Sequence, residues 1–226
     1  MQEDLDMNNI EGILFDFDGV IGDTIGDLCK TWQMALRDFN VNIGLDDYPP
    51  LEGMDMYEIA RVLGRKYGRE FTDEECKKVK ETKDRYYLEN CKFKFFPEVY
   101  LLVDYLLKSG KRLVIVTASP REKVERTVSS DFLGNFEAVV TMEDTQLKKP
   151  NPEPYFAAMK KLNLSADKCV VIENAPYGIT SAKKAGIYCI ALATTMSKEY
   201  LKEADKVFSN HSELLEFLKR QSENKI

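Results

Sequence analysis

The sequence predicts an α/β protein with a doubly wound, parallel-sheet (Rossmann-like) core and an inserted α-helical cap domain. From residue 97 onward, short apolar runs alternate with segments of helical periodicity, which is typical of parallel strands joined by crossover helices. Between residues 22 and 91 the periodicity is helical, with no convincing strand. We therefore expect a core domain formed by residues 1–21 and 92–226 and a cap domain formed by residues 22–91.

The core is predicted to begin with a strand that is buried on both faces. An apolar Ile-Leu-Phe run precedes Asp16, and Asp18 follows one residue later, so the two carboxylates would point the same way if the strand continued. Because an unpaired buried charge is costly, these acids must be solvated, paired or metal-bound. In an α/β sheet they would lie in the crevice at the carboxyl ends of the strands. The alternative is a plain strand followed by an Asp-Gly turn.

The cap domain is predicted to contain helices and turns only. Asp23 and Thr24 are good capping residues ahead of apolar residues at helical spacing. Thr72 and Glu75 have the spacing of a capping box. The helices are expected at residues 24–39, 54–67 and 72–90.

The rest of the core is predicted from its turn and cap residues. Gly110 and Gly186 mark helix ends, and Ser119-Pro120 reads as a helix N-cap followed by proline at the first helical position. His211 is expected at the start of the last helix. Strands are expected at 112–117, 138–141, 168–173, 188–191 and 206–208. Helices are expected at 97–109, 120–130, 152–162, 176–185 and 212–222.

The composition excludes several classes of protein. With 226 residues, 44% of them hydrophobic, the chain can bury a sizeable core. The net charge of −6 does not favour nucleic acid or an anionic membrane as a partner, and no apolar run approaches the length of a membrane span. The first nine residues are acidic and polar, unlike a signal peptide. A single histidine effectively excludes histidine-based triads and His metal clusters.

The cysteines indicate a reducing compartment. Their number is odd, and no two have the spacing of a metal finger or a redox pair. Cys169 and Cys189 lie in apolar runs and are expected in the core. A cytoplasmic setting fits this pattern best. The five cysteines are Cys29, Cys76, Cys91, Cys169 and Cys189.

Further polar residues are expected at the same edge of the sheet as the two aspartates. Thr117 ends one predicted strand, Glu173 and Asn174 end another, and Lys149 precedes a helix. This collection suits phosphoryl transfer through a covalent intermediate. One carboxylate attacks phosphorus, a second moves the proton, and lysine and hydroxyl groups hold the phosphoryl oxygens. Oxygen ligands suit Mg²⁺, which would offset the repulsion between the anions.

Each of these residues also has an ordinary explanation. Thr117 could be a β-branched strand residue, Lys149 a solvated lysine, and Glu173 a helix-capping acid. Ser119 is expected to be only the cap of the following helix. The order and placement of the residues together favour the phosphoryl-transfer hypothesis.

These segments resemble the haloacid dehalogenase superfamily of phosphohydrolases. The similarity is to the branch with a helical cap after the first motif, where phosphoglycolate phosphatase-like and β-phosphoglucomutase-like proteins lie. It covers about residues 10–217. The segments that carry it are 15–20 (FDFDGV), 117–119 (TAS), 149–152 (KPNP), 171–178 (VIENAPYG) and 182–186 (AKKAG).

The resemblance implies a role for each matching residue. Asp16 is implied as the nucleophile that becomes an aspartyl-phosphate. Asp18 is implied to protonate the leaving oxygen and then to activate water, while its backbone carbonyl binds Mg²⁺. The implied phosphate-binding residues are Thr117, Ala118 and Lys149. The implied metal site consists of Asp16, Asp18, Glu173 and Asn174.

The chain departs from the family pattern at two places. The commonest pattern has an acid where this chain has Asn174, whose amide oxygen can bind Mg²⁺ but carries no charge. The phosphoglucomutase-like proteins have a histidine where this chain has Leu28, and an arginine in the loop that is residues 52–56 here. Both losses disfavour a mutase. The residues that screen substrates are sought in 52–56 and among the cap cations, although these are expected to be solvated. The cations are Arg61, Lys83 and Arg85.

The expected function is that of an Mg²⁺-dependent phosphatase. It would hydrolyse a small phosphate monoester, phosphoglycolate-like or sugar-phosphate-like, through an aspartyl-phosphate. The alternatives are a β-phosphoglucomutase-like sugar-phosphate mutase, a weakly active or non-catalytic phosphate-binding relative, a haloacid dehalogenase, and a signalling receiver. A dehalogenase needs no metal, and a receiver is much shorter and has no helical insert. We expect a monomer or weak homodimer in the cytoplasm, with a small phosphorylated metabolite as its partner and neither nucleic acid nor membrane.

Overall fold

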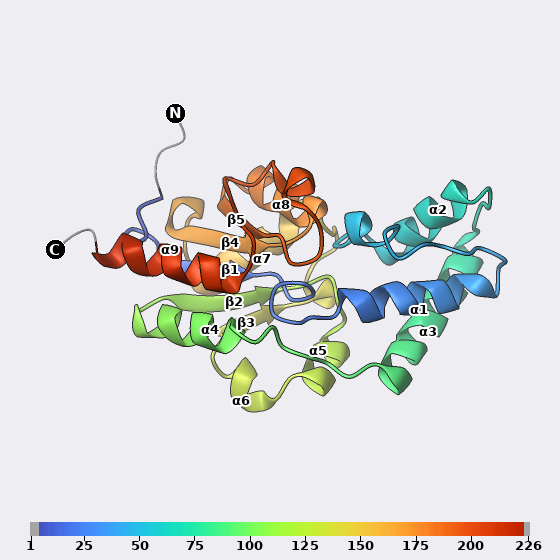
Figure 1. The fold of residues 1–226 in the computed structure, drawn as a ribbon, viewed down its shortest axis with the longest axis horizontal. Coiled ribbons are helices and arrows are strands. Elements are labelled where there is room, and N and C mark those ends of the chain that lie inside the picture. Colours follow the sequence, from blue (N-terminus) through green and yellow to red (C-terminus); the bar gives the residue numbers. More distant parts are fainter. Residues whose placement is uncertain (1–4, 224–226) are drawn as a thin grey trace.

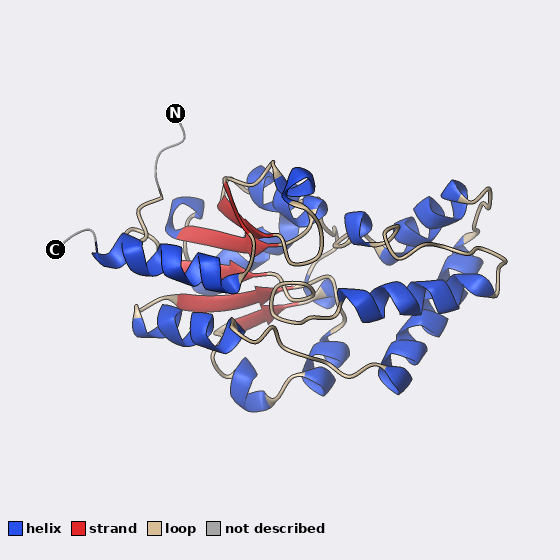
Figure 2. Ribbon diagram, viewed as in Figure 1, coloured by secondary structure: helices blue, strands red, loops and turns tan. Residues whose placement is uncertain are grey.

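The computed structural model describes residues 5–223, which form two lobes (Figure 1). One lobe holds the β-sheet with its covering helices, and the other is helical (Figure 2). Residues 1–4 and 224–226, which the sequence analysis assigns to the core domain, lie outside the described part. Among the residues described, no helix has the length and apolar character needed to cross a membrane. The predicted α/β fold class is confirmed.

The core lobe is built on a six-stranded sheet in which every neighbouring pair is parallel, as predicted. The strand order is β3-β2-β1-β4-β5-β6. Because β2 and β4 flank β1 on opposite sides, the chain order reverses there, and a crevice forms at the carboxyl ends of these strands. The strands are β1 (Gly12–Phe15), β2 (Arg112–Val116), β3 (Ala138–Val140), β4 (Cys169–Glu173), β5 (Tyr188–Leu192) and β6 (Lys206–Phe208).

Helices cover both faces of the sheet. Side chains alternate along β1, so that Ile13 and Phe15 pack into one apolar cluster and Leu14 into the other. The face with Phe15 is covered by α4 (Val99–Lys108) and α9 (His211–Glu223). The face with Leu14 is covered by α7 (Glu153–Leu162) and α8 (Pro176–Lys184). Both faces of β1 are therefore buried, which explains its uninterrupted apolar run.

The helical lobe, called the cap lobe below, has a hydrophobic core of its own. Trp32, Leu36 and Leu63 are among its fully buried residues. Its last helix begins with the predicted capping box between Thr72 and Glu75. The elements of this lobe are α1 (Ile25–Arg37), the short 3-10 turn η1 (Pro49–Leu51), α2 (Met56–Lys66) and α3 (Asp73–Asn90). A separate core allows this lobe to behave as a unit.

The two segments that join the lobes run side by side. Gly22 forms an isolated antiparallel bridge with Phe95, and the backbone N–H of Asp23 donates to the carbonyl of Lys94 at 2.8 Å. The Phe93 ring lies so close to Gly22 that a Cβ atom there would be 2.4 Å from it. The chain thus leaves and re-enters the core lobe at one place, and residues 22–91 remain our proposed extent of the cap domain.

One predicted helix cap is confirmed in position only, a second is wrong, and one predicted helix is divided. Thr24 precedes α1, but its side chain makes no capping hydrogen bond. The N-cap of α5 (Arg121–Thr127) is Pro120 rather than Ser119. The helix predicted at 120–130 ends where Val128 becomes extended, and a separate turn of helix, α6 (Ser130–Leu133), begins with the Ser129 hydroxyl as its cap. The hydroxyls of Thr24 and Ser119 are used in the site described below.

His211 lies at the start of α9, as predicted, and fixes the turn that follows Asp18. Its Nε2 lies 2.6 Å from the carbonyl oxygen of Val20, and its ring packs against Phe96 with 5.0 Å between centroids. A carbonyl can only accept, so Nε2 carries the proton. Burial lowers the pKa of His211, which favours this neutral form.

Replacing His211 with alanine is expected to reduce the free energy of unfolding by roughly 2–3 kcal/mol. The substitution removes ring packing and leaves a buried carbonyl without its donor, which alone costs about 1–3 kcal/mol. Urea denaturation measures the change. Arg220→Ala, on the exposed face of the same helix, should change stability by less than about 0.5 kcal/mol. Equal effects of the two substitutions would contradict this role for His211.

Candidate active site

The carboxyl ends of three neighbouring strands bring the predicted site residues together. Asp16 follows β1, Thr117 follows β2, and Glu173 ends β4. The backbone N–H of Asp16 donates to the carbonyl of Ile172 at 2.9 Å, which holds Asp16 against β4. Asp16 and Glu173 are 7% and 1% exposed, so their charges need partners inside the protein.

Lys149 is the partner that joins these two acids. Its Nζ donates to Asp16 Oδ1 at 2.5 Å, to Glu173 Oε1 at 2.6 Å and to the Val116 carbonyl at 3.2 Å. The ammonium also lies 5.2 Å from the centre of the Tyr155 ring. Burial opposes the charged form, but the two carboxylates outweigh it and raise the pKa of Lys149. Lys149 is therefore a buried, charged member of the site and not a solvated lysine.

Glu173 is held by hydrogen bonds to both of its carboxylate oxygens. Oε1 accepts from the Tyr155 hydroxyl at 3.0 Å as well as from Lys149. Oε2 accepts from the backbone N–H groups of Asn174 and Ala175 at 2.8 and 3.1 Å. Gly178 lies so close that a Cβ atom would be 1.7 Å from Oε1, so only glycine leaves room for this carboxylate.

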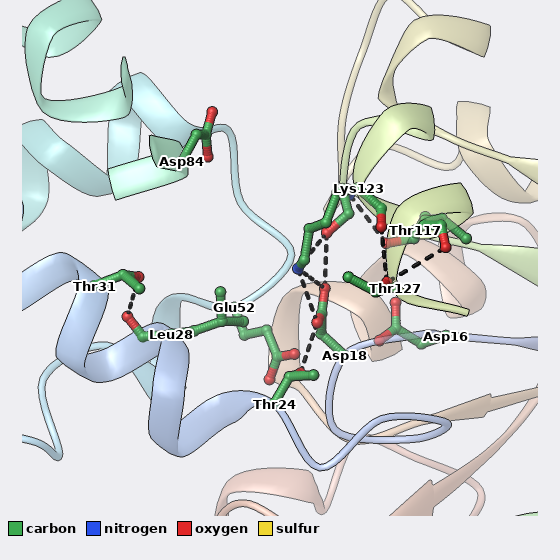
Figure 3. A network of polar contacts seen from close by, with 12 residues as sticks. Asp16, Asp18, Thr24, Leu28, Thr31, Glu52, Asp84, Thr117, Lys123 and Thr127 are labelled. Atoms are coloured by element: carbon green, nitrogen blue, oxygen red, sulfur yellow. Dashed lines mark hydrogen bonds and ion pairs between the residues drawn. The ribbon is translucent and has the colours of Figure 1, made fainter. Parts of the chain in front are cut away.

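Asp18 has a set of partners different from those of Asp16 (Figure 3). Its Oδ1 accepts from the Thr24 hydroxyl at 2.6 Å, and its Oδ2 from the Ser119 hydroxyl at 2.8 Å. Lys123 Nζ lies 3.0 Å from both oxygens and 2.9 Å from Ser119 Oγ. Lys123, on α5, also lies 4.6 Å from the centre of the Tyr87 ring in the cap lobe. Three side chains thus donate to one buried carboxylate.

The two environments shift the aspartate pKa values in opposite directions. Burial raises the pKa of Asp16 to about 8, with Lys149 opposing this effect and the nearby charge of Glu173 adding to it. Burial also acts to raise the pKa of Asp18, but the Lys123 ammonium and the donors Thr24 and Ser119 outweigh it, so this pKa is lowered. Neighbouring acids with separated pKa values can take different roles in catalysis.

The sequence analysis missed three residues of this site. Lys123 was not considered, and Thr24 and Ser119 were assigned to helix capping. A signal for Lys123 was present, because it follows Ser119 by four residues at the start of a helix that leaves a strand end, and residues four apart share a helix face. The contacts of Thr24 depend on how the turn after Asp18 folds back, which no local pattern predicts.

A small cavity of about 50 Å³ lies between the lobes above these residues. It has room for only a few water molecules at roughly 10–15 Å³ each. Thr117, whose Oγ1 accepts from the Ser119 N–H at 3.0 Å, and Ala118 line it from the core. The cavity-lining residues of the cap lobe are Leu28, Trp32, Tyr48, Glu52, Gly53, Met54, Met56, Ile59 and Lys83.

The cap cations divide into one buried and two peripheral residues. Lys83 was expected to be solvated, and this is wrong: it is 7% exposed and lines the cavity. Its Nζ lies 3.0 Å from Asp84 Oδ1, and burial lowers its pKa. Arg61 forms ion pairs with Glu58 and Asp73, and Arg85 is exposed. Helical spacing cannot distinguish these cases, because it does not reveal which face of α3 the core lobe covers.

Glu52 extends from the cap lobe into the same site (Figure 3). It is 4% exposed, and its Oε2 accepts from Asn174 Nδ2 at 2.8 Å. Burial, reinforced by the charges of Asp16, Asp18 and Glu173, raises its pKa well above the ordinary value. The same Asn174 amide nitrogen donates to Thr195 Oγ1 at 3.1 Å, whereas Asn174 Oδ1 and Glu52 Oε1 have no hydrogen-bond partner.

The fit of these residues to Mg²⁺ can be judged from their donor atoms. No group of three or more His, Cys, Asp or Glu side chains in the described chain is arranged to hold a metal ion. An unpartnered oxygen on the fully buried Asn174, which directly follows Glu173 and contacts Glu52, is, however, an available hard ligand. Carboxylate, amide and carbonyl oxygens together suit Mg²⁺, so the chemistry of the residues fits that ion.

The chain is similar to a protein family, to named phosphatases and to solved structures. A family model described as haloacid dehalogenase-like hydrolase matches residues 13–192. Validoxylamine A 7′-phosphate phosphatase of Streptomyces hygroscopicus is 37% identical over 103 residues, 45% of this chain and about half (48%) of that protein's length. A phosphorylated carbohydrates phosphatase of Thermotoga maritima is 26% identical over 93% of this chain and 99% of that protein. The solved structure of a putative β-phosphoglucomutase from Bacteroides vulgatus, 26% identical, superposes with a TM-score of 0.83 over 95% of this chain and 89% of that one.

Proposed function

The chain belongs to the haloacid dehalogenase-like hydrolases, and from this premise we propose that it is an Mg²⁺-dependent phosphatase. It hydrolyses a small phosphate monoester, phosphoglycolate-like or sugar-phosphate-like, through an aspartyl-phosphate. The observation that carries the proposal is the pair of buried aspartates that each have an ammonium partner of their own, Asp16 beside Lys149 and Asp18 beside Lys123. Relatives named as phosphatases support the reaction class.

In the first step a carboxylate oxygen of Asp16 attacks phosphorus, and the bond from phosphorus to the leaving oxygen breaks. Asp18, which must hold a proton before this step, gives it to that oxygen, and Lys149 and Thr117 hold the phosphoryl oxygens. In the second step Asp18 takes a proton from water, which attacks phosphorus and releases Asp16 and inorganic phosphate. Between the two steps Asp18 is ionised, the state that Lys123 stabilises, and the proton that it takes from water restores it for the next turnover.

Mg²⁺ would be held by Asp16, the Asp18 carbonyl, Asn174 and Glu173, and it would offset the repulsion between the Asp16 carboxylate and the phosphate dianion. The cavity has room for only a few water molecules, and this low water content strengthens the electrostatic interactions inside it. A cavity between two lobes with paired linkers also suits a cap that opens to admit substrate and closes for reaction.

We do not extend the proposal to a sugar-phosphate mutase. The side chain of Leu28, which lines the cavity from α1, can neither donate nor accept a hydrogen bond and cannot guide a sugar hydroxyl. A non-catalytic relative is also disfavoured, because the attacking carboxylate, the proton-transfer carboxylate and the phosphate-binding lysine are all present and buried together.

The proposal is tested with p-nitrophenyl phosphate as substrate. Hydrolysis is expected with millimolar Mg²⁺ and should fall at least about 100-fold in excess EDTA, because a metal ion supplies several kcal/mol of charge stabilisation. Adding Mg²⁺ in excess of EDTA should restore the rate. An equal rate with and without free Mg²⁺ would rule out the metal-dependent mechanism.

Lys83 is proposed to contact the leaving group. Its buried ammonium faces the cavity from α3, 5.6 Å from the centre of the Trp32 ring. Replacing Lys83 with methionine is expected to raise KM for 2-phosphoglycolate roughly tenfold or more, since a hydrogen bond to a charged group contributes about 1.5–3 kcal/mol. The KM for p-nitrophenyl phosphate, which has no second anionic group, should change less than twofold. Lys80→Met is the matched control, because Lys80 pairs with the same Asp84 without lining the cavity. Parallel changes for both substrates would contradict the contact.

A further inference from the structure

The contact between Glu52 and Asn174 joins the cap lobe to the core lobe beside Asp16. Glu52 directly follows η1, and Asn174 directly follows β4. The next cap residue, Gly53, has φ of +85°, which only glycine adopts without strain, and a Cβ there would lie 3.4 Å from Lys149 Cδ. The loop therefore turns against the buried lysine and directs Glu52 inward.

Each of these two residues has one oxygen without a hydrogen-bond partner. Of the buried side-chain polar atoms in the described part of the chain, Glu52 Oε1 and Asn174 Oδ1 are the two in this state. Leaving a buried acceptor unsatisfied costs about 1–3 kcal/mol, so two in one contacting pair is an unusual arrangement. Both atoms are hard oxygens that can bind a donor or a cation but cannot satisfy each other.

The charges around this pair point to a cation. Asp16, Asp18, Glu52 and Glu173 bring four carboxyl groups to the crevice, and Lys149 and Lys123 bring two ammonium groups. If all were ionised, two negative charges would be left over, the amount that one divalent cation neutralises. The other cavity lysine, Lys83, already pairs with Asp84.

We propose that Glu52 supplies, from the cap lobe, the anionic oxygen that Asn174 does not provide, so that a divalent cation binds between the two lobes. The inference rests on the proposed Mg²⁺-dependent phosphatase and extends its metal site to a residue of the cap. The proposed metal site couples metal binding to closure of the cap. A metal ion that bridges the lobes binds tightly only when the cap is closed, and its binding in turn favours closure, because linkage is reciprocal.

A single and a double substitution distinguish the effect of the negative charge from the effect of the lobe on which that charge lies. In Glu52→Gln the contact with Asn174 is retained without the charge. In Glu52→Gln with Asn174→Asp, the amide and the carboxylate exchange places, so the hydrogen bond can re-form while the negative charge moves to the core. Isothermal titration calorimetry with MgCl₂, in the absence of substrate, measures the metal affinity of each protein. Glu70→Gln, an exposed cap acid, is the matched control.

We expect Glu52→Gln to weaken Mg²⁺ binding at least tenfold, and the double variant to return to within threefold of the unsubstituted protein. Glu70→Gln should leave the affinity unchanged. An affinity of Glu52→Gln within twofold of the unsubstituted protein, or a double variant no tighter than Glu52→Gln, overturns the inference. If Glu52→Gln does not fold, the Mg²⁺ affinities of Asn174→Asp and of the double variant are compared instead. A threefold or greater weakening on adding Glu52→Gln supports the inference, and an unchanged affinity overturns it.

Small-angle scattering supplies a readout independent of affinity. Mg²⁺ should reduce the radius of gyration of the unsubstituted protein, and this change should be lost in Glu52→Gln and in the double variant, in which the charge no longer lies on the cap. An equal response of all three proteins overturns the bridge. These measurements distinguish a failure of the proposed function from a failure of the bridge. If the unsubstituted protein binds no Mg²⁺, both proposals are wrong. If the unsubstituted protein binds Mg²⁺ and hydrolyses the phosphate ester, and Glu52→Gln behaves identically, only the bridge is wrong.

Discussion

Replacing Asp16 with asparagine is expected to lower kcat by roughly 10⁴-fold or more while leaving the fold intact. The amide is nearly the same size as the carboxylate but is a poor nucleophile, so the first step loses its attacking atom. The loss should appear in kcat for every phosphate ester that the protein accepts, because the nucleophile does not depend on the leaving group. Stopped assays with p-nitrophenyl phosphate and 2-phosphoglycolate measure it.

The matched control is Asp23→Asn, an exposed acid in the same connection between β1 and α1. It should retain full activity. Circular dichroism and thermal melting of Asp16→Asn should resemble those of the unsubstituted protein, because the amide oxygen can still accept from Lys149. Metal-dependent hydrolysis that persists in pure Asp16→Asn would remove Asp16 from the mechanism.

Replacing Lys149 with methionine is expected to reduce the free energy of unfolding by about 3–5 kcal/mol and to abolish measurable turnover. Lys149 Nζ is the cation shared by Asp16 and Glu173, and removing one partner of a buried ion pair typically costs this much. Activity fails for a second reason, since the phosphoryl oxygens lose their positive partner. Urea denaturation measures the stability, and Lys160→Met, an exposed lysine on α7, should change it by less than about 0.5 kcal/mol.

The destabilisation by Lys149→Met should grow as the pH rises above about 8. In the unsubstituted protein burial raises the pKa of Asp16 to about 8, while the Lys149 ammonium opposes this rise. Without the ammonium, the pKa of Asp16 rises further, so the folded variant keeps a proton that its unfolded chain has released. Stability then falls with increasing pH through this window. A pH-independent difference between the two proteins would argue that Lys149 contributes packing alone.

The fold could be predicted from the sequence because the local sequence pattern of each core element agrees with the structure that the element adopts. The strands β1 and β4 are buried on both faces and read as uninterrupted apolar runs, and each helix of the sheet lobe carries its own start or stop residue. The six strands were predicted within two residues of their observed limits. The division of the helix after Pro120 was missed because Ser129 acts as a second cap inside a helical pattern.

The part of the site that lies on strand ends was also accessible from the sequence. Asp16, Thr117 and Glu173 meet because the carboxyl ends of parallel strands share one edge. Lys123 was missed and Lys83 was misjudged because their burial depends on contacts with other elements. Lys123 lies over the Tyr87 ring of α3, and Lys83 lies over the Trp32 ring of α1. Glu52 was only one residue of a candidate loop, and its unpartnered oxygen has no signature in the sequence.

The position of β1 in the sheet has a consequence for how the protein folds. Gly12 lies opposite Arg112 and Cys169, which come 100 and 157 residues later in the chain. Contacts between residues so far apart in the sequence form only after large loops have closed. Such contacts slow folding. The cap lobe closes shorter loops, since α1 and α3 pack together within residues 25–90. We therefore expect the cap to gain structure before β1, the strand that precedes Asp16, is locked between its neighbours. A nascent chain would acquire its catalytic machinery only after β4 has been synthesised.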